Sequence, residues 1–418
     1  MLLRKLLFGS AAAMFAVGGA HAADLTVAEP VDYVKVCDAF GAGFYYSPGT
    51  DTCIKVGGYV KFGTSVGDTD FGKYNSAYPN SQWSNFYTEV SIQLTASSVT
   101  EFGNLTGFID MRAQTGNTGS FSESLTQAAN AVTKTAYIDS AYLQLGPIKA
   151  GYFTSLFDFG RGYNDTGFFG SDTTADQIQL NYAVNGFGLA LSVEDQRDRG
   201  STGNTDGLQQ GATAYYQGGS DNVPNVIGAV SYSSGIFSTK IAAAYTDMAL
   251  DRTGTGSAAD PLTYTSQSGW AVGGNVEFAL DSFSAGDKFV IAAAYGDNAN
   301  SFTGIAGGTS VAGLSGYTTQ TIAAIASGTS WSAGASYKHV WTPSVWSAIS
   351  AGYASYSGDG AWAGADSLDA WRGIAGVGWT PVKGLDVLLE GSYNKVEGEG
   401  SIADGDAWSG VLWLKRSW

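Results

Sequence analysis

Apolar and polar residues alternate with a period of two along most of the chain after residue 52. The first such stretch begins at Cys53, where one face is apolar and the other is basic or aromatic: Ile54, Val56, Val60 and Phe62 alternate with Lys55, Tyr59 and Lys61. This periodicity predicts a β-strand with two unlike faces. An aliphatic face opposite a basic face is typical of a strand that separates lipid from water.

The same alternation recurs in six further stretches, around residues 89–94, 105–112, 177–182, 187–194, 270–278 and 385–394. Three more segments, 136–145, 226–232 and 345–356, are ambiguous because small residues occupy both faces. Many strands and no helical periodicity indicate an all-β protein.

Short and long connections alternate between these strands. The short ones carry turn-forming residues or charged turns, at 99–103, 146–147, 185–186, 234–235, 281–287, 342–344 and 381–384. Long polar stretches lie between them, for instance 196–224, 251–268 and 298–329. Seven short connections separate eight hairpins, so we predict a sixteen-stranded antiparallel transmembrane β-barrel at residues 53–418. A barrel of about that size encloses a water-filled lumen.

The last stretch, residues 407–418, supports a closed barrel. Every second residue back from Trp418 is mostly apolar, with Arg416 as the exception: Leu414, Leu412, Gly410 and Trp408. An apolar strand with a free edge is a poor arrangement for a soluble protein. We expect this strand to pair with the first one and to end near the membrane surface.

Composition and the first residues indicate export. Two basic residues, an apolar run at 6–17 and the sequence Ala20-His21-Ala22 predict a signal peptide at 1–22. Without these residues the formal net charge changes from −16 to −18, because they hold two bases and no acid. Such an acidic balance argues against nucleic-acid binding. In an exported chain, Cys37 and Cys53 are expected to form a disulfide that ties an N-terminal segment, 23–52, to the first strand; two free thiols are the alternative.

The third long connection, residues 154–174, differs from the others. It contains four Phe residues together with acids and tyrosine. A fully solvated loop has no use for four Phe side chains, whereas a loop packed against a wall would bury them. We therefore expect this third loop to fold inward, against the lumen wall.

Both ends of the chain and a short stretch at 141–146 resemble a known family. Residues 34–46 (VKVCDAFGAGFYY) and 48–60 (PGTDTCIKVGGYV), then AYLQLG at 141–146 and the ending AWSG…RSW at 407–418, resemble the alphaproteobacterial outer-membrane porins. The resemblance implies a general diffusion porin, which is a homotrimeric channel in the bacterial outer membrane that passes small hydrophilic solutes and ions without a cofactor. It further implies that acids on the third loop face bases on the barrel wall. Here the loop acids are Asp158, Asp165 and Asp172, beside one base, Arg161, and the wall bases are Lys55, Lys61, Arg112, Lys149, Lys338 and Arg372.

The matches of this sequence to catalytic and metal-binding motifs are weak. Residues 63–67 match G-x-S-x-G, but no helical pattern follows and the chain after residue 22 has a single histidine, His339. One histidine is too few for the common two- and three-histidine metal sites. We therefore expect neither an enzyme nor a metal protein.

Two other functions compete with general diffusion. A channel selective for one class of solute would need stacked aromatics along the lumen, to which Tyr59, Tyr142 and Tyr163 could contribute. A barrel adhesin would need a large passenger segment before the first strand, and that strand is expected to start at Cys53.

Overall fold

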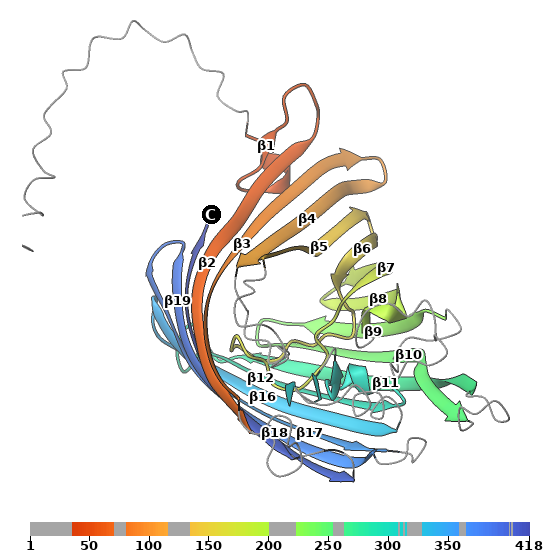
Figure 1. Cartoon of the computed structure of the whole chain (residues 1–418). Helices are drawn as coiled ribbons and strands as arrows, with labels where there is room; N and C mark the ends of the chain where they lie inside the picture. The colour runs from red at the N-terminus through yellow and green to blue at the C-terminus, as the bar shows by residue number, and fades with distance from the viewer. Residues whose placement is uncertain are drawn as a thin grey trace, which may run out of the picture.

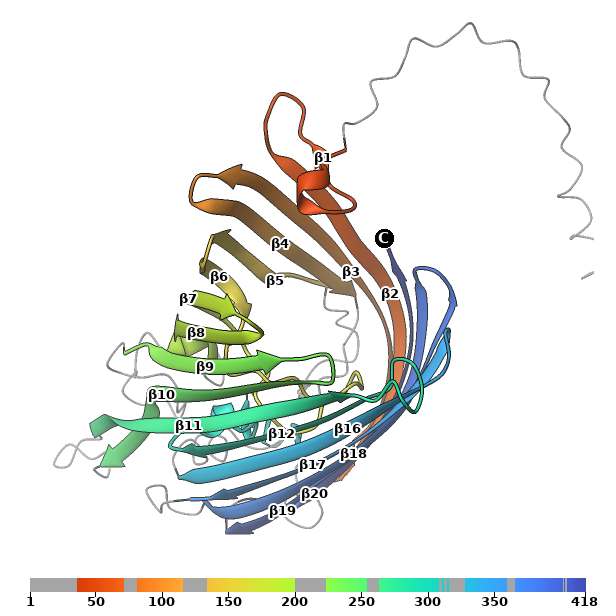
Figure 2. The ribbon, with the colours of Figure 1, turned by 180° about the vertical axis from the view of Figure 1, so that it is seen from behind.

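Sixteen long antiparallel strands form one closed barrel. The structure, a computed structural model, describes residues 36–70, 81–115, 134–199, 223–253, 263–307, 310–311, 314–315, 328–358, 365–400, 402 and 404–418. Each long strand pairs with its neighbours in the chain, and β2 also pairs with β20, which closes the sheet (Figures 1 and 2). The predicted sixteen-stranded barrel is confirmed. The predicted signal peptide lies outside the described residues.

The strands differ widely in length. The longest, β3, has 20 residues and the shortest of the barrel, β6, has 7. Their bounds are β2 (Cys53–Asp70), β3 (Ser81–Thr100), β4 (Gly103–Thr115), β5 (Lys134–Leu145), β6 (Ile148–Thr154), β7 (Thr174–Val184), β8 (Phe187–Glu194), β9 (Asn225–Ser233), β10 (Phe237–Thr253), β11 (Thr263–Ala279), β12 (Lys288–Asp297), β16 (Thr329–Thr342), β17 (Val345–Ser357), β18 (Ala365–Val382), β19 (Leu385–Gly400) and β20 (Gly405–Ser417). Short elements lie outside this wall: η1 (Asp38–Phe40), β1 (Tyr45–Tyr46), η3 (Gln196–Arg199), η4 (Asn300–Phe302) and a small sheet of β13 (Ala306–Gly307), β14 (Ser310–Val311) and β15 (Leu314–Ser315).

Alternation sets the two faces of the wall. In β20, Trp408, Leu412 and Leu414 are exposed, whereas Trp413 between them is buried. In β19, Leu389 is 60 % exposed and the adjacent Glu390 only 3 %. The apolar side chains therefore lie on the outer face, which suits a surface that contacts lipid.

All seven short connections occur where the sequence predicts them, since each joins two consecutive strands. One of the two-residue connections is Asn185-Gly186, where φ is 50° and 82°. Positive φ at both central positions is the geometry of a two-residue hairpin, which Asn and Gly adopt at low cost. Of the connections predicted to be long, 251–268 is wrong in its bounds, because β10 runs to Thr253 and β11 starts at Thr263. Residues 251–253 and 263–268 are polar apart from Tyr264, so no apolar alternation marks them as strands.

The turn between β11 and β12 holds a buried carboxylate, Asp287. It accepts hydrogen bonds from the Val340 amide at 2.8 Å and from the Tyr337 hydroxyl at 2.7 Å, and its Oδ2 lies 2.8 Å from Nδ1 of His339. Burial acts to raise the pKa of Asp287, but these hydrogen bonds outweigh it and hold the pKa below its ordinary value.

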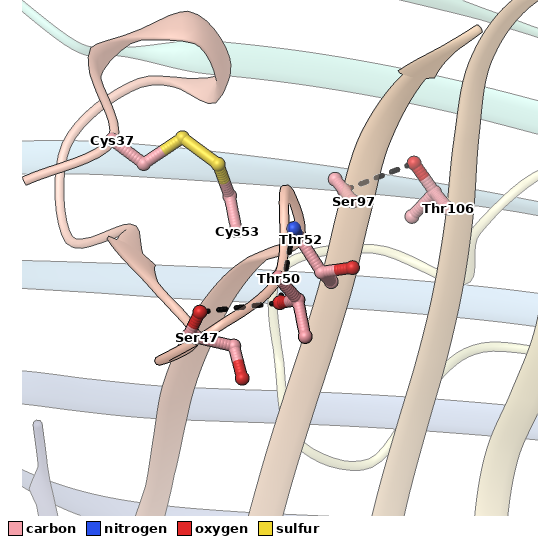
Figure 3. Close-up of a disulfide and its surroundings, with 7 residues drawn as sticks. All are labelled: Cys37, Ser47, Thr50, Thr52, Cys53, Ser97 and Thr106. Atoms are coloured by element: carbon pink, nitrogen blue, oxygen red, sulfur yellow. Dashed lines mark hydrogen bonds between the residues drawn. A yellow bond between two sulfur atoms is a disulfide. The ribbon is translucent and has the colours of Figure 1, made fainter.

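A covalent clip secures the start of β2. Cys37 and Cys53 form a disulfide, as predicted, and both are buried (Figure 3). The two-residue strand β1 pairs with the beginning of β2, Tyr46 opposite Cys53. The segment 37–52 is thus held to the barrel at two places.

No helix among the described residues is long and apolar enough to cross a membrane.

Candidate functional site

The segment 155–173, which joins β6 to β7, contacts strands that are distant in the sequence. The backbone amides of Asp165 and Thr166 donate to the two carboxylate oxygens of Glu390 in β19, at 2.8 and 2.7 Å. The Tyr163 hydroxyl donates to Glu277 in β11 at 3.0 Å. Glu390 lies on the face opposite the exposed apolar residues, so the segment meets the polar face of the wall.

Aromatic side chains fix the segment against that face. Phe157 and Phe168 are completely buried. The ring of Phe168 lies over Gly334 in β16, while Cβ of Phe168 and the ring of Phe169 lie beside Gly352 in β17, the register partner of Gly334. A Cβ atom at Gly334 would lie 2.2 Å from this ring. Gly334 therefore makes the room that the Phe168 ring occupies, and Gly352 makes room for Cβ of Phe168 and for Phe169.

A buried ion pair holds both ends of the segment. Nε of Arg199, in η3, donates to Glu194 at the end of β8 at 3.1 Å, and both side chains are fully buried. The same guanidinium donates to Ser155 at the start of the segment and to Ser171 near its end, the latter at 3.1 Å. It also lies 3.9 Å from the centre of the Phe302 ring. Arg199 thereby ties the two ends of the segment to each other and to the wall.

The three acids predicted on this segment lie in different surroundings. Asp158 is half-buried and accepts from the Gly160 amide at 2.8 Å; burial raises the pKa of Asp158, and this hydrogen bond opposes the rise. Asp165 is exposed and accepts from the indole of Trp413 at 3.2 Å. Asp172 is exposed and forms an ion pair with Arg161. Two of the three acids are therefore accessible to solvent.

Of three predicted wall bases, Lys61 and Arg372 lie near the middle of their strands and Arg112 lies three residues before the end of β4. Nζ of Lys61 lies 3.1 Å from Glu89. Arg112 lies 3.0 Å from Asp110 and 2.8 Å from Asp139. Arg372 donates to the carbonyl of Gly167 at 2.8 Å and stacks on the ring of Phe169. Only Arg372 of these three hydrogen-bonds the segment directly.

The other three predicted bases lie nearer the short-turn end of the barrel. Lys55 is exposed, and its ammonium lies 5.8 Å from the Phe44 ring centre, beside the disulfide clip. Lys149 lies 3.8 Å from the ring centre of Tyr142. Lys338 lies 4.7 Å from the ring of Trp346. These three form none of the ion pairs found among the described residues.

Sequence reasoning missed three basic residues that the structure places at this site. Lys240 donates to the carbonyl of Asp158, and Lys415 lies 5.1 Å from the ring of Trp413. Both occupy polar positions of an alternating strand, which was a usable signal. Arg199 follows a strand in a polar connection, where nothing local distinguishes a buried arginine from a solvated one.

No catalytic or metal centre emerges from the described residues. Residues 63–67, the G-x-S-x-G match, lie inside β2, paired on both sides with β3 and β20. A nucleophile elbow needs a strand-to-helix turn, which an uninterrupted strand does not provide. Within the described part of the chain, no group of three or more His, Cys, Asp or Glu side chains could hold a metal ion.

An apolar outer face, a charged inner face and closure into one sheet define a bacterial outer-membrane β-barrel. The chain belongs to the porin family, because the profile of the Porin subfamily matches residues 24–411. Family members are channels and not enzymes. Membership and fold together place the chain in the outer membrane.

Two curated relatives match about half of the chain. Porin Omp2b of Brucella abortus is 32 % identical over 244 residues, which cover 56 % of this chain and 63 % of that protein. Outer membrane protein IIIA of Rhizobium leguminosarum bv. viciae is 36 % identical over 249 residues, covering 58 % of this chain and 62 % of that protein. The chain thus spans less than two thirds of the length of either relative.

Among solved structures, the outer membrane channel DcaP of Acinetobacter baumannii has a similar fold. The TM-score is 0.60 at 14 % identity, and the match covers 89 % of this chain and 99 % of that one. Identity at this level supports the barrel fold alone.

Proposed function

We propose that this chain is a general diffusion channel, through which small hydrophilic solutes and ions cross the outer membrane down their gradients. The observation that carries the proposal is the contrast between the two faces of the closed barrel. The outer face presents apolar side chains such as Leu389 and Leu412, whereas the inner face presents charged pairs such as Lys61–Glu89. A barrel of sixteen strands leaves a lumen that side chains do not fill, and a charged wall keeps that lumen wet.

The segment 155–173 is the size-limiting element in this proposal. Its hydrogen bonds to Glu390 and Glu277 and the packing of Phe168 on Gly334 support a position inside the lumen, as the sequence predicts. Because those contacts reach strands well beyond β6 and β7, the segment would narrow the channel rather than lie over its rim.

The charge pattern supports a transverse field at this narrowing. Asp165 and Asp172 are exposed on the segment, while Lys61 and Arg112 lie on β2 and β4. Low-dielectric walls focus the field of confined charges. Such a field orients polar solutes and disfavours apolar ones, which would have to displace ordered water.

Single-channel recording tests both levels of the proposal. Purified protein in a planar bilayer should give discrete conductance steps, and a salt gradient should give a reversal potential with modest cation preference. Replacing Asp158, Asp165 and Asp172 together by Asn keeps their size and removes three negative charges. The reversal potential should then shift toward anions at 0.1 M salt, with little change in conductance at 1 M, where the Debye length falls from ~10 to ~3 Å. Unchanged selectivity at 0.1 M would refute the site, and absence of conductance would refute the channel.

A channel tuned to one class of solute is less well supported. Of the three tyrosines considered, Tyr142 stacks on Phe108 at 5.1 Å between ring centres. Tyr59 and Tyr163 instead donate their hydroxyls to Glu89 and Glu277. Three tyrosines so engaged do not form a continuous aromatic track.

We also propose that the channel is a homotrimer. A hollow of about 400 Å³ lies over β3 to β6 and is lined by outward residues that are apolar or small, including Leu94, Gly107, Leu143 and Ala150. Small residues allow two barrels to approach closely. Unheated detergent samples should migrate near three times the monomer mass, and a monodisperse monomer in mild detergent would contradict the proposal.

A further inference from the structure

Three lysines on the inner face of the wall lie against aromatic rings instead of carboxylates. Nζ of Lys149 lies 3.8 and 3.9 Å from the ring centres of Tyr142 and Phe153. The corresponding distance from Lys338 to Trp346 is 4.7 Å, and that from Lys415 to Trp413 is 5.1 Å. None of the three forms an ion pair with a described residue. An aromatic ring attracts a cation through its quadrupole but carries no net charge. The positive charge of each lysine therefore remains available to a solute.

Alternation places these lysines on the inner face. Lys149 follows Ile148, which is 51 % exposed, and Lys415 lies between the exposed residues Leu414 and Arg416. Lys338 lies two residues after Ser336 in β16, so both side chains point to the same face. Ser336 is buried and accepts a hydrogen bond from the Tyr163 amide. Successive side chains of a strand point to opposite faces, so all three lysines point away from the lipid side.

All three also lie near the same end of the barrel, the one with the short turns. Lys149 is the second residue of β6, which follows the 146–147 turn. Lys415 is two residues from the end of β20, and Lys338 four residues from the end of β16. At about 3.3 Å per residue these positions lie within roughly 13 Å of the strand ends. The three strands are not neighbours in the sheet, so the charges are distributed around its inner circumference.

The segment 155–173 lies on the other side of two of these lysines. Ser336 and Trp413, which hydrogen-bond to the segment, are each two residues further from the turns than Lys338 and Lys415. Two other inner-face bases are paired with carboxylates, Lys61 with Glu89 and Arg112 with Asp110, and Lys61 is the register partner of Lys415. Toward the turns, the solvent-exposed acids on the segment are thus followed by lysines that form no ion pair with a described residue; Asp386 in β19 is the register partner of Lys415.

We propose that Lys149, Lys338 and Lys415 form a basic ring that binds small multivalent anions, carboxylates or phosphates, entering from the short-turn side. The inference rests on the proposed channel and adds an axial asymmetry to its transverse field. An anion from the turn side meets the lysines first, whereas one from the long-loop side meets Asp165 and Asp172 first. Partial block by a multivalent anion should therefore be one-sided.

Citrate in a planar bilayer is a direct probe. Single channels are recorded in 0.1 M KCl, and citrate is added to one chamber and then, in a separate run, to the other. Each channel should be blocked more strongly from one chamber, whichever way it is inserted. The combined variant Lys149→Gln, Lys338→Gln and Lys415→Gln should weaken the stronger block by about tenfold, because three charges near a trivalent anion are removed at modest screening. At 1 M KCl, parent and variant should converge.

A matched control removes three bases outside the ring: Lys383→Gln in a turn, Lys395→Gln and Arg416→Gln on the outer face. This variant has the same net charge as the first and should keep the one-sided block. If the triple ring variant does not fold, each single substitution should weaken the block about twofold, one third of the combined effect on a logarithmic scale.

The outcomes separate the two proposals. A conducting channel that citrate blocks equally from both chambers overturns the ring and leaves the channel intact. A block that is one-sided but unaffected by the ring substitutions also overturns the ring. A protein that forms no conducting channel overturns both.

Discussion

Replacing Arg199 with Met should release the segment 155–173 without unfolding the barrel. The substitution removes one partner of a fully buried ion pair and leaves the Glu194 carboxylate without its cation. It also removes donors to Ser155 and Ser171, one at each end of the segment. Breaking a buried pair in this way costs about 3–5 kcal/mol. Every 1.4 kcal/mol is about tenfold, so the population of displaced segment should rise at least about a hundredfold.

Single-channel recordings at 1 M KCl measure this population as open-channel noise. We expect the Arg199→Met channel to switch between conductance levels that are rare in the parent. Arg161→Met is the matched control, because the partner of Arg161, Asp172, has a side chain that is 62 % exposed. Exposed pairs contribute about 0–1 kcal/mol, so this control should add little noise.

A double variant tests whether the noise of Arg199→Met comes from the unpaired Glu194 carboxylate or from a general loss of packing. In Glu194→Gln with Arg199→Met, no uncompensated charge remains, so noise should fall below that of Arg199→Met alone. If Arg199→Met has the noise and conductance of the parent, the ion pair does not hold the segment. If the double variant is noisier than either single variant, uncompensated charge is not the cause.

Three further outcomes follow from particular contacts. Gly334→Ala should displace the Phe168 ring and alter conductance, and adding Phe168→Ala should restore the parent value; a normal conductance for Gly334→Ala alone would contradict the packing described. Asp287 has a lowered pKa, so the stabilisation by its carboxylate is present above the unfolded pKa of about 4 and is lost as pH falls through the lower folded pKa. The hydrogen-exchange protection of the amides in the 280–287 turn should therefore decrease below about pH 4 in the parent, and this pH dependence should be absent in Asp287→Asn. Reducing the Cys37–Cys53 disulfide should make residues 38–52 sensitive to protease while the barrel keeps its heat-dependent gel mobility; loss of that mobility would mean that the clip stabilises the whole barrel.

The barrel was predictable because its signal is local. In β2 and β20 a period of two follows directly from which side of the wall each residue faces, and short turns such as Asn185-Gly186 mark where the chain reverses. The prediction failed for 251–268, where the ends of β10 and β11 consist almost entirely of polar residues. There the ladder of backbone hydrogen bonds defines the strands, and side-chain pattern carries no information.

The site was less predictable because its contacts are distant in the sequence. Acids and aromatics in 154–174 indicated an unusual loop, and the position of that loop inside the lumen stays a prediction. The hydrogen bonds from the amides of Asp165 and Thr166 to Glu390 depend on how the sheet closes. No local sequence pattern indicates that closure. Arg199 was missed for the same reason, since its partners are assembled only when β8 and the ends of the segment meet.

Closure through β2 and β20 also determines the order in which the barrel can be completed. The two strands are separated by more than 330 residues, whereas most neighbouring strands in the sheet are joined by short turns or single loops. Bringing the ends of so long a chain segment together costs on the order of 4 kcal/mol more entropy than closing a two-residue hairpin. Before this step, β2 and β20 each present an open edge with unpaired amides and carbonyls, which can pair with another chain. The pairing of β2 with β20 is therefore the slow step and the one most exposed to pairing with another chain. A factor that assists assembly of this protein would act most effectively by binding those two edges.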